Sequence, residues 1–215
     1  MTASATQPKL AKRYDKASPG WRRKINALGY PAAYGEFFEQ SVGADAESAT
    51  WQVLDAGTGC GDFAKAFVDT VGAPEAITLL DISRAMLDRA EILLGEYVPR
   101  VESRCGTVEE LDSVRTFDAV LCAHVIEHCG DYRKALAALA RSLKPGGRLL
   151  LVASKPHWCT TLIRLLWRNK AFHPKTMCSL LTDAGFEQIQ TVAFPSGPPS
   201  RTSFGYAART PRVTR

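Results

Sequence analysis

The sequence predicts one α/β domain, in which a mostly parallel β-sheet carries helices on both faces. From Trp51 onward, short apolar segments typical of buried strands alternate with longer segments of helical periodicity. The chain has 215 residues, of which 46% are hydrophobic. It can therefore bury a sizeable core, and one domain with a short appendage is the simplest organisation.

The N-terminal segment, residues 1–45, precedes the first strand and belongs to no strand–helix repeat. Its first ten or so residues are small and polar, and we expect them to be disordered. Between Tyr14 and Val42 the chain is rich in aromatic residues, and Pro31 suits the first turn of a helix. We expect this segment to form a helical cap on the sheet.

The region that follows contains the predicted strands and helices. The strands lie at about 51–55, 76–81, 99–104, 117–122, 147–153, 187–194 and 203–209. The helices lie at about 61–71, 83–94, 131–143, 158–168 and 174–184. The last two strands are close in sequence and are joined by a segment rich in proline and glycine, so we expect them to pair as antiparallel neighbours.

The segment Trp51–Phe63, WQVLDAGTGCGDF, is the strongest indication of a binding site. A short apolar strand ends at Asp55 and is followed by glycines at alternate positions, Gly57, Gly59 and Gly61. Because glycine has no Cβ, a ligand can approach the backbone of such a turn closely. The segment therefore predicts a small-molecule site between a buried strand and the next helix.

The spacing of these glycines indicates which small molecule binds. Dinucleotide-binding turns have the pattern G-x-G-x-x-G, but Asp62 stands where the third glycine is expected. The sequence also lacks the G-x-x-x-x-G-K-S/T pattern of phosphate-binding loops. Its G-x-G-x-G pattern, with an acid two residues earlier, resembles motif I of the class I S-adenosylmethionine (SAM)-dependent methyltransferases. SAM carries an ammonium and a sulfonium, which favour a carboxylate such as Asp55, whereas a pyrophosphate would be repelled.

This resemblance covers about residues 45–210 and implies a Rossmann-like seven-stranded sheet with the strand order 3-2-1-4-5-7-6. It divides the chain into an N-terminal tail and helical cap, 1–45, and a SAM-binding domain, 46–210. The segments LKPGGRLLL and LLTDAGFEQI resemble the ubiquinone/menaquinone-biosynthesis type of methyltransferase. In methyltransferases of this build, the segment before the sheet often forms a lid over cofactor and acceptor. A helix that only caps the sheet edge is the alternative.

By this resemblance, the SAM-binding residues follow the strands at their carboxyl ends. Asp81 can accept hydrogen bonds from both ribose hydroxyls, although it could instead cap the next helix. Ile82 packs against the adenine, and Thr107 stands where the family commonly has an aspartate that contacts the adenine amino group. The predicted cofactor-binding residues are Asp55, Gly57, Thr58, Gly59, Gly61, Asp81, Ile82, Met86, Thr107, Val108, Ala123 and His124.

The segment AHVIEHCGD, after the fourth strand, is the predicted source of a general base. Methyl transfer requires an aligned, desolvated nucleophile and removal of its proton where necessary. His124 and His128 share a face if this segment is helical, and Glu127 is adjacent. We predict that His128 or His124 is catalytic, with purely structural histidines as the alternative. A metal site of these histidines with Cys129 has no evident fourth ligand, so no metal is predicted.

Residues of the N-terminal aromatic segment and of the segment after the fifth strand are the candidates for acceptor binding. The candidates are Tyr14, Trp21, Tyr34, His157 and Trp158. The segment after the fifth strand also has an apolar face that carries Arg164 and Arg168. Three roles are open for this face. It packs in the core, it forms a wall of the acceptor pocket, or it lies on a membrane surface as a basic amphipathic helix does.

Composition and charge exclude some classes. No apolar run reaches the roughly 18 residues that span a bilayer, and the N-terminus lacks the apolar core of a signal peptide. The six cysteines form no C-x-x-C pair, which suits reduced thiols in a cytoplasmic protein. The net charge is +5, with clusters of basic residues that either meet an anionic partner or are solvated.

The sequence therefore predicts a cytoplasmic SAM-dependent methyltransferase that acts on a small molecule. The N/D-P-P-Y/F tetrapeptide of base methyltransferases is missing after the fourth strand, so no nucleic-acid partner is expected. A lipid or quinone-like amphiphile is the alternative acceptor and leaves peripheral membrane contact open. A non-catalytic SAM-binding scaffold is the alternative from another class.

Overall fold

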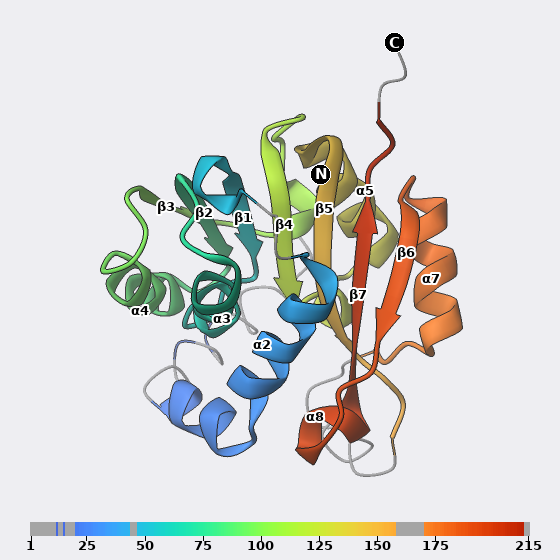
Figure 1. The fold of residues 1–215 in the computed structure, drawn as a ribbon, viewed down its shortest axis with the longest axis horizontal. Coiled ribbons are helices and arrows are strands. Elements are labelled where there is room, and N and C mark those ends of the chain that lie inside the picture. Colours follow the sequence, from blue (N-terminus) through green and yellow to red (C-terminus); the bar gives the residue numbers. More distant parts are fainter. Residues whose placement is uncertain (1–11, 13–14, 16–19, 44–46, 158–169, 213–215) are drawn as a thin grey trace.

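The computed structural model describes residues 12, 15, 20–43, 47–157 and 170–212. They contain a seven-stranded sheet with the order β3-β2-β1-β4-β5-β7-β6 (Figure 1). The strands are β1 (Gln52–Ala56), β2 (Ala76–Asp81), β3 (Val101–Cys105), β4 (Phe117–Ala123), β5 (Leu143–Ser154), β6 (Glu187–Val192) and β7 (Ser203–Arg209). The predicted number of strands and the predicted strand order are confirmed.

The helices cover both faces of this sheet, as predicted. They are α2 (Tyr30–Ser41), α3 (Asp62–Val71), α4 (Arg84–Leu94), α5 (Tyr132–Ser142), α7 (Pro174–Asp183) and α8 (Gly197–Thr202), with short 3₁₀ helices at Ser48–Thr50, Val108–Glu110 and Ile126–His128. Residues 20–27 are also helical and lead into α2. The helix predicted at 158–168 and the tail predicted to be disordered lie outside the described residues.

Strand pairing follows the prediction, with two local differences. β1 to β5 pair in parallel, and β7 is antiparallel to both β5 and β6. The connection between β6 and β7 contains α8, which the sequence did not predict, although its prolines suit a first helical turn. β5 begins earlier than predicted, because Leu143 already pairs with Phe117.

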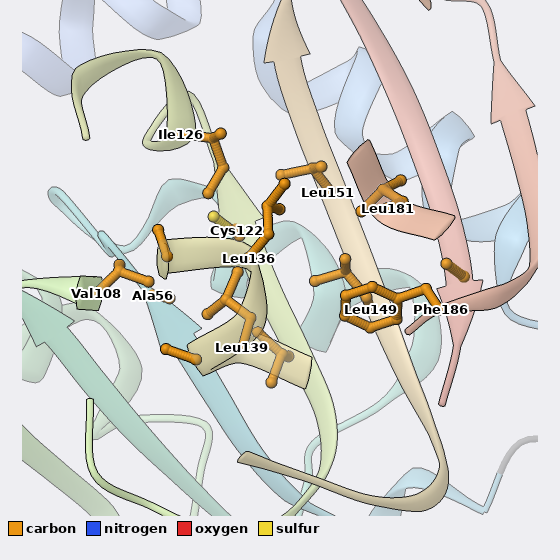
Figure 2. Packing of buried hydrophobic residues seen from close by; sticks show 14 of the residues in the cluster. Ala56, Val108, Cys122, Ile126, Leu136, Leu139, Leu149, Leu151, Leu181 and Phe186 are labelled. Carbon is orange, nitrogen blue, oxygen red and sulfur yellow. The ribbon is translucent and has the colours of Figure 1, made fainter. Parts of the chain in front are cut away.

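Side chains of the central strands alternate between two hydrophobic cores. On one face, residues such as Leu54 and Leu151 pack under α5 and α7, together with the buried side chains shown in Figure 2. On the other face, their neighbours Val53 and Leu150 pack under α2, α3 and α4. Both faces of the parallel strands are therefore covered, which explains why these strands read as continuous apolar runs.

Helix α2 is part of the second core and lies across the face of the sheet (Figure 1). Its Phe37 and Phe38 have no exposed surface. Phe37 packs so closely on β7 that a Cβ at Gly205 would lie 2.5 Å from Phe37 Cδ2. The helix approaches the strand at this point because Gly205 has no side chain.

We expect Gly205→Ala to lower the free energy of unfolding by about 1 to 3 kcal/mol, because the new methyl group overpacks the contact with Phe37. Gly43→Ala is the matched control, since a Cβ there meets no atom within 4 Å. Urea unfolding of both variants checks this prediction. Equal stabilities of the two variants would contradict the close contact between α2 and β7.

Candidate active site

A cavity of about 420 Å³ lies where the parallel strands β1, β2 and β4 end. This is the edge of an open α/β sheet where ligands bind, and the volume is that of a typical small-molecule site. The helix at 20–27 and α8 lie at the same edge of the sheet (Figure 1). The predicted residues that line the cavity are Trp21, Tyr34, Gly57, Thr58, Gly59, Asp81, Ile82, Met86, Thr107, Val108, Ala123, His124 and His128.

Other predicted site residues are placed differently. Asp55, Gly61 and His157 are described by the structure but do not line this cavity. Tyr14 and Trp158 lie outside the described residues. The roles assigned to these five residues therefore stay predictions.

The glycine turn after β1 is built from left-handed backbone. Gly57, Gly59 and Gly61 have φ values of 74°, 54° and 84°. A Cβ at Gly57 would lie 2.1 Å from a methyl group of Val125, so no other residue fits there. A Cβ at Gly61 would lie 3.2 Å from Ala90 of α4. Gly57 and Gly61 thus allow neighbouring residues to pack closely against the turn. Gly57 and Gly59 leave the backbone of the turn accessible from the cavity.

Asp81, at the end of β2, is hydrogen-bonded to this turn. Its Oδ2 accepts from the Gly59 amide at 2.9 Å, and its Oδ1 accepts from the Ser83 amide at 2.9 Å. Burial raises the pKa of Asp81, and the backbone hydrogen bonds from Ser83, Gly59 and Ile82 oppose this rise. A carboxylate has about four lone-pair sites, so Asp81 can still accept a hydrogen bond from a ligand.

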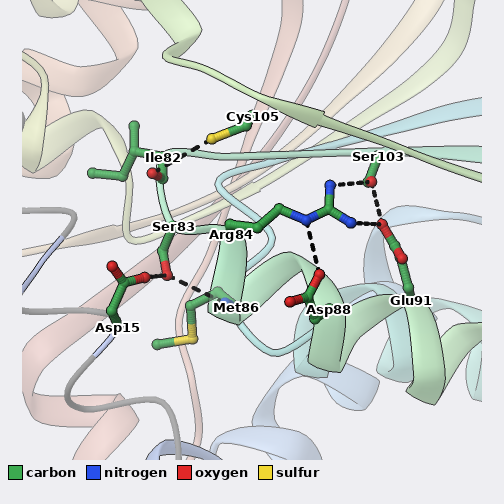
Figure 3. Close-up of polar contacts among 9 residues, drawn as sticks. All are labelled: Asp15, Ile82, Ser83, Arg84, Met86, Asp88, Glu91, Ser103 and Cys105. Atoms are coloured by element: carbon green, nitrogen blue, oxygen red, sulfur yellow. Dashed lines mark hydrogen bonds and ion pairs between the residues drawn. The ribbon is translucent and has the colours of Figure 1, made fainter.

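The N-terminus of α4 is capped by Ser83 rather than by Asp81. Ser83 Oγ accepts from the Met86 amide at 3.2 Å and donates to Asp15 of the N-terminal segment at 2.5 Å (Figure 3). Next to it, Arg84 is held by side chains of α4 and β3, namely Asp88, Glu91 and Ser103. Ser83 therefore caps the helix, and Asp81 lines the cavity without serving as the cap.

Asp55 lies beneath the glycine turn and is almost fully buried. Its Oδ2 accepts a hydrogen bond from Thr58 Oγ1 at 2.5 Å. Burial raises the pKa of Asp55 to about 7, the hydrogen bond from Thr58 opposes the rise, and the nearby Asp81 and Asp62 add to it. This carboxyl group therefore titrates close to neutral pH.

The loop after β4 brings His124, Glu127 and His128 to the cavity. His124 has a left-handed φ of 59° and lies outside the 3₁₀ helix Ile126–His128, so the two histidines do not share a helical face as the sequence suggested. Burial lowers the pKa of His128. Burial also opposes ionisation of Glu127, but the hydrogen bond and positive charge of His124 outweigh it and lower the pKa of Glu127 to about 2.

The N-terminal segment covers the cavity from the other side. Trp21 Nε1 lies 4.0 Å from the point that a Cβ of Gly59 would occupy. The Tyr30 ring meets the His124 ring edge-on, with centroids 5.3 Å apart, and the Tyr30 hydroxyl lies 3.2 Å from Thr202 Oγ1 of α8. The segment before the sheet thus contacts the glycine turn, the loop after β4 and α8.

Several lining residues were missed by sequence reasoning. They are Lys24, Ile25, Leu28, Tyr30, Pro198 and Thr202. Trp21, Lys24, Ile25 and Leu28 follow the i, i+3, i+4, i+7 spacing of one helical face, which would have predicted this group. The residues of α8 had no such signal, because the helix itself was not predicted.

In the described part of the chain, no three His, Cys, Asp or Glu side chains are grouped so that they could hold a metal ion. No helix found there combines the length and the apolar character that crossing a bilayer requires.

The fold and the site define the class of this domain. Residues 53–147 match a family model described as a methyltransferase domain. The chain is also similar to the N-methyltransferase NodS from Bradyrhizobium japonicum, solved with S-adenosyl-L-homocysteine (SAH), with a TM-score of 0.74 at 16% identity over 96% of this chain and 99% of NodS. The resemblance to SAM-dependent methyltransferases that the sequence predicts is confirmed by the match of residues 53–147 to this family model.

Among proteins with named functions, the chain is similar to two kinds from quinone biosynthesis. It is 35% identical over 112 residues to a ubiquinone biosynthesis O-methyltransferase of Xanthomonas oryzae, covering 51% of this chain and 46% of that one. It is 37% identical over 109 residues to a ubiquinone/menaquinone biosynthesis C-methyltransferase of Idiomarina loihiensis, covering 49% and 43%. The chain therefore matches less than half the length of these relatives.

The same fold also occurs in the (4+2)-cyclase SpnF, with a TM-score of 0.73 at 17% identity over 99% of this chain and 98% of SpnF. At such identity the similarity shows the fold alone. The fold is thus compatible with reactions other than methyl transfer.

We expect the stability of the protein to depend on pH through Asp55. Its pKa is raised from 3.8 to about 7 on folding, so the folded state holds this proton more tightly than the unfolded state does. The contribution of Asp55 to stability is therefore highest below pH 4 and decreases, by up to about 4 kcal/mol, as the pH rises to 7.

The variant Asp55→Asn cannot ionise but keeps a side-chain oxygen for Thr58. Urea unfolding between pH 4 and pH 8 measures the free energies of unfolding of wild type and variant. The other titrating groups contribute equally to both, so they drop out of the difference. The variant should become more stable relative to the wild type as the pH rises to 7. A difference that stays constant over this range would show that Asp55 does not titrate there.

Proposed function

We propose that the chain binds SAM in this cavity and transfers its methyl group to a small molecule. The observation that carries the proposal is the hydrogen bond between Asp81 Oδ2 and the Gly59 amide, which joins a half-buried carboxylate to the open glycine turn. A diol fits the free lone pairs of Asp81, and a cation fits the carboxylate-rich surroundings of Asp55, Asp62 and Asp81. SAM has both groups.

We assign the residues of the cavity to three parts of SAM. Asp81 accepts the ribose hydroxyls, and the apolar Ile82, Met86 and Val108, with Thr107, surround the adenine. Gly57, Gly59, Ala123 and His124 border the methionine part. When bound, SAM supplies a methyl group on a positively charged sulfur, and the protein residues bind it, exclude water and orient the acceptor.

We assign acceptor binding to the face formed by Trp21, Ile25, Leu28, Tyr30 and Tyr34. Apart from the tyrosine hydroxyls and the indole N–H, these side chains are apolar, and three of them are aromatic. They suit a planar or apolar acceptor. The named relatives in quinone biosynthesis support a quinone-like acceptor as the alternative to a more polar small molecule.

The N-terminal segment acts as the lid in this proposal, because it contacts both the glycine turn and α8. Peripheral membrane contact is part of the quinone-like alternative. The basic apolar helix that suggested such contact lies outside the described residues.

A scaffold that binds SAM without transferring its methyl group is the second candidate. The similarity to the (4+2)-cyclase SpnF favours keeping it, since that protein has this fold and is named for another reaction. Binding of SAM supports both candidates, and only transfer of the methyl group separates them.

We expect calorimetry to detect binding of SAM and of SAH to the wild type. Asp81→Ala should weaken this binding about 10- to 100-fold, because a hydrogen bond to a charged group contributes about 1.5 to 3 kcal/mol. Asp88→Ala, an exposed acid on the following helix that pairs with Arg84, is the control and should bind SAM like the wild type. Unchanged affinity in Asp81→Ala would refute the role of Asp81.

We also expect a labelled methyl group to reach a small molecule. The protein is incubated with methyl-labelled SAM and fractionated cell extract, and the label is then measured in each fraction. Label in the water-soluble small-molecule fraction supports the main proposal, and label in extracted lipids supports the amphiphile. Label in protein or RNA would contradict both, and no label with SAM bound would favour the scaffold.

A further inference from the structure

We propose that His124 is the general base of the reaction and that Glu127 positions it, which requires an acceptor whose reacting atom is a hydroxyl oxygen. The inference rests on the proposed methyl transfer. It is drawn from the hydrogen bond between these two side chains at the wall of the cavity. Each of them also has a buried polar atom for which the described residues provide no partner.

The contact between the two residues fixes the orientation of the imidazole. His124 Nδ1 lies 3.2 Å from Glu127 Oε1 and 3.3 Å from Ser154 Oγ. Glu127 Oε1 also accepts from the Ser154 amide at 2.9 Å, which ties the carboxylate to the end of β5. Because ionised Glu127 can only accept hydrogen bonds, it holds the proton of neutral His124 on Nδ1. His124 Nε2 is then the basic nitrogen.

Two atoms of this pair are left for a ligand. Among the residues that the structure describes, His124 Nε2 and Glu127 Oε2 are buried and have no hydrogen-bond partner. Both residues line the cavity, and Glu127 is only 2% exposed. An unsatisfied buried polar atom costs about 1 to 3 kcal/mol. A ligand that donates a hydrogen bond to Nε2 removes this cost.

The backbone at His124 also indicates a functional role. A φ of 59° is unfavourable for a residue with a side chain, and such strain is concentrated at active sites. His124 directly follows β4, and its ring contacts Tyr30 on the acceptor side. It thus lies between the proposed cofactor part of the cavity and the proposed acceptor part.

His128 is the less suitable base for geometric reasons. His128 is the last residue of the 3₁₀ helix Ile126–His128, whereas His124 lies outside it with its Nδ1 3.2 Å from Glu127 Oε1. Titratable groups that face His124 are Glu127 and His128 from its own loop and Tyr30 from α2. Of these three, ionised Glu127 is the group that stabilises a protonated His124.

The proton transfer balances with the methyl transfer. The O–H bond of the acceptor breaks as the new N–H bond forms on His124 Nε2. The freed oxygen lone pair forms the bond to the methyl carbon, while the carbon–sulfur bond breaks and its electron pair stays on sulfur. His124 is left as an imidazolium, stabilised by Glu127, and returns its proton to water. A base in this position suits an acceptor such as a phenol or a catechol.

The first test uses the ligand-free protein and does not depend on activity. Nitrogen-15 NMR of histidine-labelled protein, assigned with His124→Gln, reports the tautomer and the titration midpoint of His124. We expect the Nδ1–H tautomer at neutral pH in the wild type. In Glu127→Gln we expect the midpoint to move to lower pH, by about one unit or more, because a carboxylate no longer stabilises the imidazolium.

Two matched variants separate Glu127 from its surroundings. Glu109→Gln removes another carboxylate of the cavity wall, and Ser154→Ala removes the other oxygen near Nδ1. Both should keep the Nδ1–H tautomer, and Glu109→Gln should also keep the midpoint. An Nε2–H tautomer in the wild type, or a midpoint that Glu127→Gln leaves unchanged, would overturn the inference. If Glu127→Gln does not fold, the tautomer of His124 in the wild type and the kinetics of His124→Gln test the inference instead.

The second test measures methylation of catechol against pH. His124→Gln should lower kcat about 100-fold or more, with less effect on KM, and should abolish the acid limb of the profile. Glu127→Gln should shift that limb to lower pH. Wild-type kinetics retained in His124→Gln would overturn the role of the base. No transfer to catechol by protein that binds SAM would overturn the inferred acceptor, whereas absence of SAM binding would refute the proposed function instead.

Discussion

The site depends on how the ends of β1 and β2 are joined. The Gly57 and Thr58 amides both donate to the carbonyl oxygen of Leu80, at 2.6 Å and 3.0 Å, and Asp81 accepts from the Gly59 amide. These bonds hold the glycine turn against the neighbouring strand. The positions of the cofactor contacts proposed for the glycine turn and for Asp81 follow from this connection, because the two lie at its two sides.

Three carboxylates at or near the cavity differ in their electrostatic environment. Burial raises the pKa of Asp55 and Asp81, which have hydroxyl and backbone N–H donors but, among the described residues, no cation that opposes this rise. Glu127 is as deeply buried as Asp55, yet its pKa is lowered, because His124, His128 and Ser154 favour its charged form. The cavity therefore combines carboxylates that would gain from a cationic ligand with one whose charge is already compensated. This division separates the proposed roles of cofactor binding and proton transfer.

The sheet could be predicted from the sequence because its signal is local. Strands such as β1 and β4 are continuous apolar runs, and the glycine turn and Asp81 stand at fixed distances from their ends. The acceptor face was harder to predict, since Tyr30 and Thr202 meet at the cavity from positions 172 residues apart in the chain. The pairing of Glu127 with His124 was missed for another reason. It depends on the left-handed backbone at His124, whereas sequence reasoning considered a regular helix there.

The close contact of Phe37 with Gly205 has a consequence for how this scaffold can diversify. It anchors α2 to the central sheet, while the helix at 20–27 precedes it across Gly29, whose φ is 79°. Side chains on that first helix can change in size and polarity without disturbing either core. In the proposed function, new selectivity for methyl acceptors can therefore evolve, or be engineered, by exchanging about one helical turn at the entrance while the proposed nucleoside-binding half is left intact.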